Sequence, residues 1–413
     1  MWIRMRLDIG WRDLLAGFWL GLFAGNRDSA AARLEAAWAN DNDALACFTV
    51  RSGLDLILSA LALPAGSEVL YSAVTVPDMV RVAREHQLVP VPIELSGADL
   101  HVDVEALRRA LSPRSKLLIV AHLFGARPDM SQVLEIAHGA GVLVIEDCAQ
   151  AWCDRADRGD PLADASLFSF GAIKTATALG GALLRVRDPV LLARMREIQR
   201  TYPVERQSGF TAKICKYSAL KLISARPLFR LLVWYGRTKG LTVDQVIGRW
   251  TRAFSAADLM AQLRQQPCAA LLRLLERRLG TYPKQRIPRR IGNARLLIDR
   301  LQLAKDSPEL TDERHSFWLF PLPSTRPGDL VDALWSVGVD SARYGRLDVV
   351  MPPPDRPDLV CKNARRLLDE IVFVPCYPEM SRHTILRIGD TIERLSPQGV
   401  TVGCTGPAPG SRG

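Results

Sequence analysis

Lys174 and Asp147 are the two residues whose chemistry stands out. Lys174 ends the segment Ser-Phe-Gly-Ala-Ile-Lys, and Asp147 ends the run Val-Leu-Val-Ile-Glu-Asp, 27 positions earlier. A lysine amine can form a Schiff base with an aldehyde, and a carboxylate can hold the proton of a pyridine nitrogen. Together they fit pyridoxal phosphate chemistry. Each alone has a plainer interpretation, as a solvated surface charge or a helix cap.

Ordered motifs surround this pair. In chain order they are His-Leu-Phe-Gly with a later aspartate (122–129), Glu-Asp-Cys-Ala-Gln-Ala (146–151), Ser-Phe-x-x-x-Lys (169–174) and Gly-Gly-Ala (180–182). With these motifs the chain resembles the DegT-type family of pyridoxal-phosphate-dependent aminotransferases, best known for aminating keto groups of nucleotide-linked sugars. The resemblance extends from about Arg33 to Ser396 and is densest between Ser52 and Val186.

The resemblance implies a fold, a cofactor and a reaction. The expected fold is that of fold-type I pyridoxal phosphate enzymes: a large α/β domain with a mostly parallel sheet covered by helices, and a smaller C-terminal α+β domain. The expected assembly is a homodimer with a shared active site. An amino acid, glutamate by resemblance, would aminate the coenzyme. The coenzyme would then aminate a keto or aldehyde group of an anionic, nucleotide-linked sugar.

The resemblance also implies roles for single residues near the coenzyme ring. Lys174 would hold the coenzyme and shuttle the proton between the substrate carbon and the coenzyme. Asp147 would pair with the pyridine nitrogen, and Gln150 would contact the ring-oxygen side. Val76 stands where relatives place an aromatic or histidine ring, so it would cover the ring face without stacking.

The coenzyme phosphate is expected between two segments. Ser169 occupies the position at which the family uses a hydroxyl for this contact. Ser52, Gly53 and Leu54 are expected at the opening of the first helix of the domain, where main-chain N–H groups and the positive helix end attract an anion.

The chain departs from the family pattern at four places. Leu54 stands where the family usually has a threonine. Asp55 follows it and would place a negative charge near the phosphate. Val76 replaces the stacking ring, and Leu179 replaces a glutamate before the paired glycines. The partner-subunit asparagine of the family has no counterpart near residues 249–254.

Short apolar runs alternate with helical patterns between residues 44 and 146, which is typical of a parallel α/β sheet covered on both faces. Strands are expected at 44–49, 68–71, 89–93, 116–121, 142–146, 166–170 and 182–186, and helices near 53–63, 77–86, 103–111 and 129–140. We divide the chain into an N-terminal helical segment (1–30), a large coenzyme-binding α/β domain (31–255), connecting helices with a small α+β domain (256–396) and a flexible tail (397–413).

Composition limits the partners. The chain has 413 residues, 48% apolar, and a formal charge of +10. No nucleic-acid motif accompanies this charge, so an anionic substrate or membrane is favoured and nucleic acid is not. Eight scattered cysteines without Cys-x-x-Cys, and histidines without ligand spacing, predict reduced thiols, no metal and a cytoplasmic, possibly membrane-associated, location.

Two segments combine apolar and basic residues. Residues 14–25 imitate a signal peptide, but twelve residues cannot span a bilayer, and Asp8 and Asp13 interrupt the positive region. We therefore expect a packed or interfacial helix there. The stretch 206–243, a basic helical insertion, has no acidic residue between Arg206 and Val243. It fits an amphipathic helix pair packed on the large domain, or a peripheral membrane contact.

Other classes of function stay open. One is a catalytically idle protein of the same fold with a regulatory or membrane-associated role. Another is a pyridoxal-phosphate-dependent lyase or dehydratase. Some relatives that dehydrate carry a histidine at the position of Lys174, so the lysine favours transamination. Cysteine desulfurases need a thiol on a mobile loop, for which Cys148 is badly placed.

Overall fold

The computed structural model describes residues 2–3, 6–23, 25–39, 42–96, 100–224, 258–303, 314–343 and 347–395. Contacts divide the chain into two compact units. Unit 1 consists of Met1–Ala62 and Leu167–Tyr282, and unit 2 consists of Leu63–Ser166 and Pro283–Gly413. Half of the predicted basic insertion (residues 225–243) and the whole predicted tail (397–413) lie outside the described residues. The domain boundaries expected from the sequence stay predictions.

A seven-stranded sheet carries the fold, with the strand order β1-β8-β7-β6-β5-β2-β4. Strand β2 pairs in parallel with β4 and β5, β5 pairs in parallel with β6, and β1 pairs antiparallel with β8. The mostly parallel sheet covered by helices confirms the predicted α/β class. The strands are β1 (Ala44–Cys47), β2 (Glu68–Ser72), β4 (Val89–Ile93), β5 (Ser115–Ala121), β6 (Leu143–Asp147), β7 (Ala165–Ser169) and β8 (Ala182–Val186).

Unit 1 contains β1, β8 and most of β7. Its helices are α1 (Trp11–Phe23), α2 (Arg27–Trp38), α3 (Val50–Leu61), α7 (Pro189–Thr201), α8 (Gln207–Ile223), α11 (Leu259–Leu263) and α12 (Ala269–Thr281). Capping residues explain where two of them begin. Thr49 accepts a hydrogen bond from the Ser52 amide before α3, and Asp188 accepts one from Val190 before α7.

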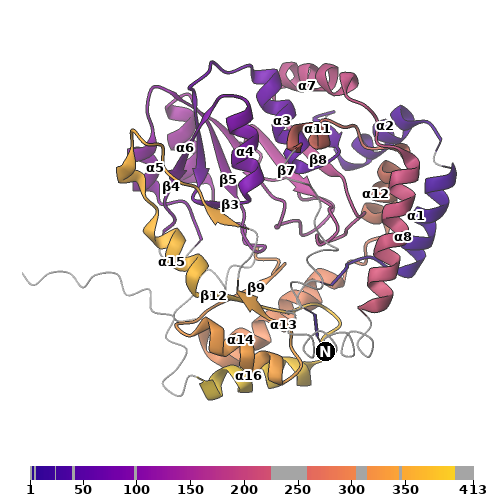
Figure 1. Cartoon of the computed structure of the whole chain (residues 1–413), viewed down its shortest axis with the longest axis vertical. Coiled ribbons are helices and arrows are strands. Elements are labelled where there is room, and N and C mark those ends of the chain that lie inside the picture. The colour runs from indigo at the N-terminus through magenta and orange to yellow at the C-terminus, as the bar shows by residue number, and fades with distance from the viewer. Residues whose placement is uncertain are drawn as a thin grey trace, which may run out of the picture. The chain divides into compact units, whose positions relative to one another are not determined.

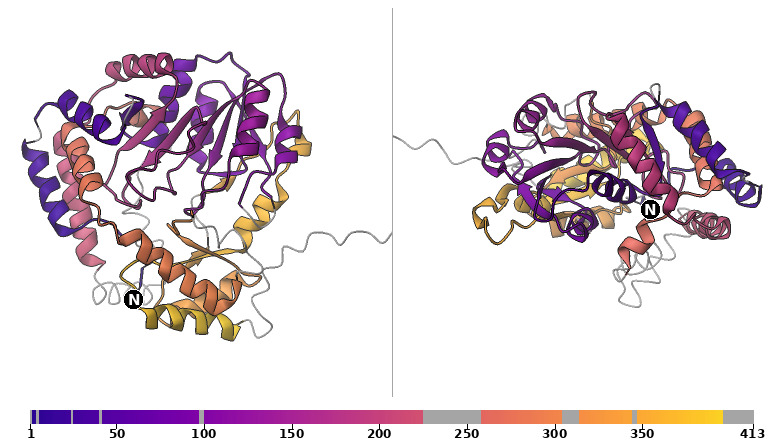
Figure 2. Two further views of the ribbon diagram at one scale, coloured as in Figure 1. Left: turned by 180° about the vertical axis from the view of Figure 1, so that it is seen from behind. Right: turned by 90° about the horizontal axis from the view of Figure 1, so that it is seen from above.

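Helices α1, α8 and α12 form one layer of unit 1, and Figures 1 and 2 show them side by side. Two glycines of α1 allow the close approach. A Cβ on Gly17 would lie 2.7 Å from Ile214 Cδ1, and one on Gly21 would collide with Thr211. The N-terminal apolar segment is therefore a packed helix. None of the described helices combines the length and apolarity needed to cross a membrane.

Unit 2 contains the alternating strands and helices from β2 to β6. Its helices there are α4 (Pro77–Glu85), α5 (Val104–Ala110) and α6 (Ser131–Gly139). Leu70, Val91, Leu118 and Val144, one from each parallel strand, meet in one buried apolar cluster. The apolar runs read from the sequence are therefore strands buried in a core.

The later part of unit 2 is a small α+β arrangement. It contains a three-stranded antiparallel sheet with the order β10-β12-β9. Its elements are α13 (Arg286–Leu301), β9 (Phe320–Pro323), α14 (Pro327–Ser336), β10 (Ala342–Arg343), the 3-10 helix η3 (Pro357–Leu359), α15 (Lys362–Glu370), β12 (Ile371–Val374) and α16 (Arg382–Leu395). Separately, β11 (Asp348–Val349) pairs with β3 (Val74–Thr75).

Candidate active site

Lys174 and Ser169 lie around one glycine in unit 1. Strand β7 ends at Ser169, and Lys174 follows in a turn closed by a 2.9 Å hydrogen bond from its amide to the Gly171 carbonyl. A Cβ placed on Gly171 would lie 3.6 Å from Ser169 Oγ and 3.9 Å from Lys174 Cγ. The structure therefore places the side-chain stem of Lys174 and the hydroxyl of Ser169 on either side of one position, the side-chain position at Gly171.

Residues 170–181 connect β7 with β8 and contain Lys174, and we call them the lysine loop. Hydrogen bonds of the Phe170 main chain hold this loop. The Phe170 carbonyl accepts hydrogen bonds from the amides of Ala178 (3.1 Å) and Gly180 (3.2 Å) and from Thr177 Oγ1 (3.1 Å). The Phe170 amide in turn donates to the Gly181 carbonyl at 3.0 Å. The loop is thus closed at its base, between the ends of β7 and β8.

The N-terminal segment of the chain holds the far side of this loop. Asp8 Oδ2 accepts a 3.0 Å hydrogen bond from the Ala176 amide and a 2.7 Å bond from the Tyr282 hydroxyl. Arg278 donates to the Thr177 carbonyl at 3.0 Å and to the Asp8 carbonyl. Ala176 has a φ of +53°, a left-handed conformation that costs energy for a residue with a Cβ. Asp8 was noted in the sequence, but this partnership was missed.

The start of α3 differs from the sequence expectation. The helix begins at Val50 and is capped by Thr49, three residues before the Ser52 to Leu54 opening that we expected. The Gly53 amide donates to the Thr49 carbonyl at 3.0 Å, and Ser52 Oγ donates to the Leu263 carbonyl at 2.7 Å. The Gly53 amide and the Ser52 hydroxyl thus have protein acceptors, and the roles predicted for these residues toward a phosphate stay predictions.

Gly53 has a packing reason instead. A Cβ on Gly53 would lie 2.6 Å from Leu184 Cδ2, so the glycine allows α3 to approach β8 closely. Leu54 is fully buried. The roles of Ser52, Gly53 and Leu54 toward the coenzyme stay predictions, now with a structural alternative for each of the three.

Asp55 is an ion-paired carboxylate and not an isolated charge, and its predicted place near the phosphate stays a prediction. Its side chain is 0% exposed and accepts hydrogen bonds from Arg264 Nη2 (3.1 Å) and Tyr202 Oη (2.8 Å). Burial, followed by the neighbouring carboxylate, raises the pKa of Tyr202, so its hydroxyl stays protonated and donates. The ion pair neutralises the carboxylate within unit 1.

Asp147 and Gln150 come together in unit 2, at the carboxyl end of β6. Asp147 is 8% exposed, and its Oδ1 accepts a 3.0 Å hydrogen bond from the Ala149 amide. Gln150 Oε1 accepts a 2.9 Å hydrogen bond from the Phe124 main-chain amide, which fixes the orientation of the Gln150 side chain. The side-chain nitrogen of Gln150 is then the group that can donate to a ligand. Ligands of parallel α/β sheets bind at this edge, so the position agrees with the predicted roles.

Val76 is the other residue of unit 2 that is predicted to contact the coenzyme ring. It precedes α4 as the N-cap residue in an extended conformation, with Pro77 at the first helical position. The preceding Thr75 is buried and belongs to the short ladder between β3 and β11. The contact of Val76 with a coenzyme ring stays a prediction.

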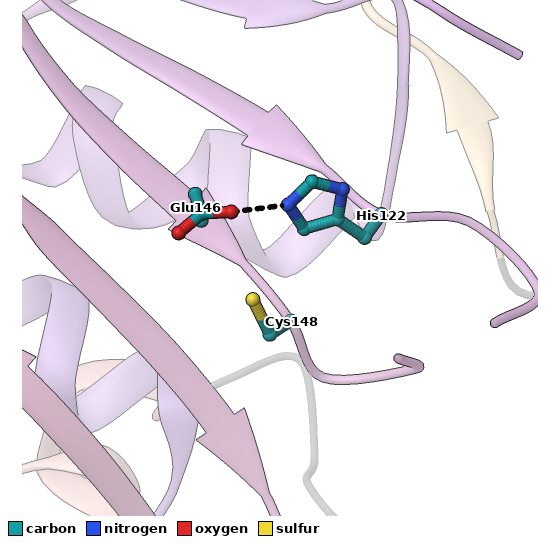
Figure 3. Close-up of side chains that lie close together, drawn as sticks. All are labelled: His122, Glu146 and Cys148. Carbon is teal, nitrogen blue, oxygen red and sulfur yellow. Dashed lines mark hydrogen bonds and ion pairs between the residues drawn. The ribbon is translucent and has the colours of Figure 1, made fainter. Parts of the chain in front are cut away.

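The two sequence neighbours of Asp147 belong to a buried polar cluster of His122, Glu146 and Cys148, which Figure 3 shows. His122 Nε2 and Glu146 Oε1 are 2.7 Å apart. Burial alone would raise the pKa of Glu146, but the hydrogen bond and charge of His122 hold it down at about 2. The His122 amide donates to the Asp147 carbonyl at 3.0 Å, so the cluster fixes the strand end that carries Asp147.

The potential ligand atoms of this cluster lie within 4.8 Å of one another, a spacing that a metal ion can use. The neighbouring Arg127 favours a hydrogen-bonded network over a metal site. Its guanidinium donates to Cys148 Sγ at 3.2 Å and to Asp157 at 2.8 Å. A cation in that position competes with a metal for the thiol. Burial raises the pKa of Cys148 well above its ordinary value, so the residue is a thiol and not a nucleophilic thiolate.

The predicted site residues are thus distributed over both units. Unit 1 carries Ser52, Gly53, Leu54, Ser169 and Lys174, and unit 2 carries Val76, Asp147 and Gln150. The family position of a partner-subunit asparagine, near residues 249–254, lies outside the described residues.

Comparisons with known proteins identify relatives. The model of the DegT/DnrJ/EryC1/StrS aminotransferase family matches residues 14–219. L-glutamine:2-deoxy-scyllo-inosose aminotransferase of Streptomyces kanamyceticus is 30% identical over 207 residues, 47% of each chain. GDP-perosamine synthase of Caulobacter vibrioides is 31% identical over 160 residues, 37% of this chain and 42% of that protein. The chain thus spans about half the length of these relatives.

Solved structures share the fold over nearly the whole chain. The aminotransferase TlmJ from Streptoalloteichus hindustanus has a TM-score of 0.66 at 17% identity and covers 95% of this chain and 98% of its own. NtdA from Bacillus subtilis, solved with its bound cofactor PMP, has a TM-score of 0.67 at 18% identity and covers 96% and 84%. At such identities the likeness establishes the fold, which is that of fold-type I aminotransferases.

Proposed function

The chain belongs to the DegT/DnrJ/EryC1/StrS aminotransferase family, and from this premise we propose that it is a pyridoxal-phosphate-dependent sugar aminotransferase. The donor is an amino acid, glutamate or glutamine, and the acceptor is a keto or aldehyde group of a nucleotide-linked sugar. The observation that carries the proposal is the placement of Lys174 and Ser169 around Gly171 on a fastened loop.

Each unit, taken by itself, carries groups whose chemistry suits a part of pyridoxal phosphate. Unit 1 offers the amine of Lys174 and the hydroxyl of Ser169, and unit 2 offers the buried carboxylate of Asp147 and the fixed amide of Gln150. An amine suits the aldehyde of the coenzyme, a hydroxyl suits its phosphate, and a carboxylate suits its ring nitrogen. When bound, the coenzyme supplies the carbonyl that captures amino groups and the ring that withdraws electrons.

In this mechanism Lys174 has two tasks. Its amine would hold the coenzyme, and the same amine would move a proton at the substrate carbon. Both tasks require a fixed approach direction. The bonds at Phe170 and Asp8 on either side of the lysine supply this direction.

Asp147 keeps a proton on the ring nitrogen. Its position at the end of a buried strand, backed by the bond between the His122 amide and the Asp147 carbonyl, holds the carboxylate in one place. A neutral amide at this position keeps the shape and loses the charge. We expect Asp147→Asn to slow the amino transfer by about 10²–10³, the scale on which one preorganised charge acts in an enzyme.

The test is reduction of the coenzyme-loaded protein with borohydride, which fixes a Schiff base, followed by mass spectrometry of the peptides. We expect the pyridoxyl group on Lys174, its loss in Lys174→Ala, and its retention in Lys116→Ala, which removes an exposed lysine of β5. An adduct on another lysine, or none, would contradict the proposal.

Activity is tested on the same preparations. Glutamate or glutamine should abolish the visible absorbance of the bound coenzyme, and a nucleotide-linked keto sugar should restore it. A protein that carries the Lys174 adduct but responds to no amino acid is the idle alternative. Release of ammonia or water from the sugar without an amino donor identifies the lyase or dehydratase alternative.

We further propose that the active protein is a homodimer. The support is the resemblance to a family whose sites are shared between two subunits. Light scattering on the purified protein measures the mass. A monomer that transaminates at full rate would refute the shared site.

A further inference from the structure

Helix α1 carries an apolar face that points outward. Its outward side chains are between 38% and 70% exposed: Trp11, Leu15, Phe18, Trp19, Leu22 and Phe23. At 100° per residue these six positions fall within about 140° of the helix circumference. We call them the α1 face. A continuous exposed apolar surface of this kind is typical of a site that binds another protein or a membrane.

The opposite side of α1 is fixed in unit 1. Gly17 and Gly21 bring it against α8 and α12, and the buried Asp13 receives ion pairs from Arg277 (2.9 Å) and Arg278 (2.7 Å). Turning the helix over would expose the glycine contacts and break both ion pairs. The outward position of the α1 face is therefore set by the fold of unit 1.

Basic residues border the α1 face. Lys221 of α8 lies over the Trp11 ring, 6.0 Å from its centroid, and Arg273 of α12 donates to the Phe23 carbonyl at 3.4 Å. Arg12 and Lys216 are exposed on α1 and α8. Helix α8 contains no acidic residue, and the acid of α1 is the buried Asp13. The surroundings are thus cationic.

This combination favours an anionic lipid surface over a second copy of the chain. In a two-fold symmetric contact the same cations face one another, which repels. On a bilayer, tryptophan and phenylalanine rings enter the boundary of head groups and acyl chains, and lysine and arginine pair with anionic head groups. The helix has 13 residues and is about 20 Å long, so it lies flat on the surface.

We propose that the α1 face, together with Lys216 and Lys221 of α8, seats the protein on anionic membrane surfaces. The inference does not depend on the proposed reaction. These side chains are not among the residues assigned to the site of Lys174 and Asp147. Their replacement should therefore leave amino transfer unchanged.

The test is flotation of the full-length protein with vesicles of phosphatidylcholine alone or mixed with phosphatidylglycerol. The wild-type protein should float with the mixed vesicles, and added salt should weaken binding. Leu15→Glu and Trp19→Glu should each reduce binding at least about tenfold, as expected when a charge is placed in the apolar boundary. The matched control is Val190→Glu, which changes a 57% exposed residue of α7 and should bind as the wild type does.

A charge variant tests the proposal independently of the apolar residues. Lys216→Glu combined with Lys221→Glu should abolish the preference for anionic vesicles, whereas Lys116→Glu on β5 should not. Melting temperature shows that each variant is folded. Equal binding by Trp19→Glu and Val190→Glu, or equal binding to neutral and anionic vesicles, would overturn the proposal. So would no flotation together with a mass that falls in Trp19→Glu, which would assign the face to a second copy.

Discussion

Asp8→Ala is the substitution that most directly tests how the lysine loop is held. It removes the acceptor of the Ala176 amide and of the Tyr282 hydroxyl. Ala176 is fully buried, so its N–H cannot turn to water. The hydrogen bond from Arg278 Nη2 to the Asp8 carbonyl does not involve the Asp8 side chain and should remain.

The magnitude follows from these contacts. Leaving a buried donor without an acceptor costs about 1–3 kcal/mol, and the left-handed φ of Ala176 costs about 1–2 kcal/mol that the bond to Asp8 helps to offset. We expect Asp8→Ala to lower the free energy of unfolding by about 3 kcal/mol. Asp8→Asn keeps an oxygen acceptor and should lose about 1 kcal/mol, as should Tyr282→Phe, which leaves the Ala176 bond in place.

The assays are urea denaturation and the rate at which glutamate or glutamine bleaches the bound coenzyme. A loosened loop misplaces Lys174, so Asp8→Ala should slow bleaching by about 10- to 100-fold, the scale of a catalytic group displaced by about 1 Å. The control is Asp28→Ala, which removes an exposed acid paired with Arg27 at the surface and should change neither quantity. If Asp8→Ala and Asp28→Ala unfold at the same urea concentration, Asp8 does not hold the loop.

Three further predictions concern buried groups. Arg264→Ala should destabilise the protein by about 3 kcal/mol in urea denaturation, because it leaves the buried Asp55 carboxylate without its cation; an unchanged midpoint would refute the pair. The pKa of Glu146 is lowered from 4.5 to about 2 by folding, so its contribution to stability is present above pH 4.5 and is lost as the pH falls toward 2. Glu146→Gln should flatten the acid limb of the stability profile in this window, and an unchanged limb would contradict the assignment. Gly53→Ala should lower the free energy of unfolding by about 1–3 kcal/mol because the new methyl group meets Leu184, whereas the exposed Gly209→Ala, within α8, should not destabilise.

The sheet could be predicted from the sequence because its signal is local. Parallel strands buried on both faces are short apolar runs between helical patterns. The strands at 89–93 and 182–186 agree with the structure at both ends, and the others differ by one or two residues. Periodicity and strand length are properties of neighbouring residues, so no tertiary information was needed.

The helix start at Val50 shows where local reasoning failed. The helix was predicted near residues 53–63, but Thr49 supplies the cap that fixes the beginning of α3 at Val50. The glycine is needed for the approach of Leu184, which lies on a strand far along the chain. The local sequence did not indicate this packing role of Gly53, whose predicted phosphate contact stays a prediction.

Asp55 shows the same limit for charge. Its partners Tyr202 and Arg264 are 147 and 209 positions away, so its neutralisation could not be seen in the surrounding residues. The two acids of the N-terminal segment are similar. In the sequence, Asp8 and Asp13 only interrupt a basic stretch. Their partners in the structure are Arg277, Arg278 and Tyr282, more than 260 positions later in the chain.

Arg278 connects these observations. Its guanidinium reaches Asp13 on α1, the Asp8 carbonyl before α1, and the Thr177 carbonyl in the lysine loop. The inner side of the N-terminal segment therefore orders the loop that carries Lys174, while its outer side presents the α1 face. Because one helix has both contacts, a change that displaces α1 as a whole should disturb the loop, and a change confined to the outward side chains should not. The two sets of variants, Asp8 on one side and Leu15 or Trp19 on the other, separate these roles within a single segment.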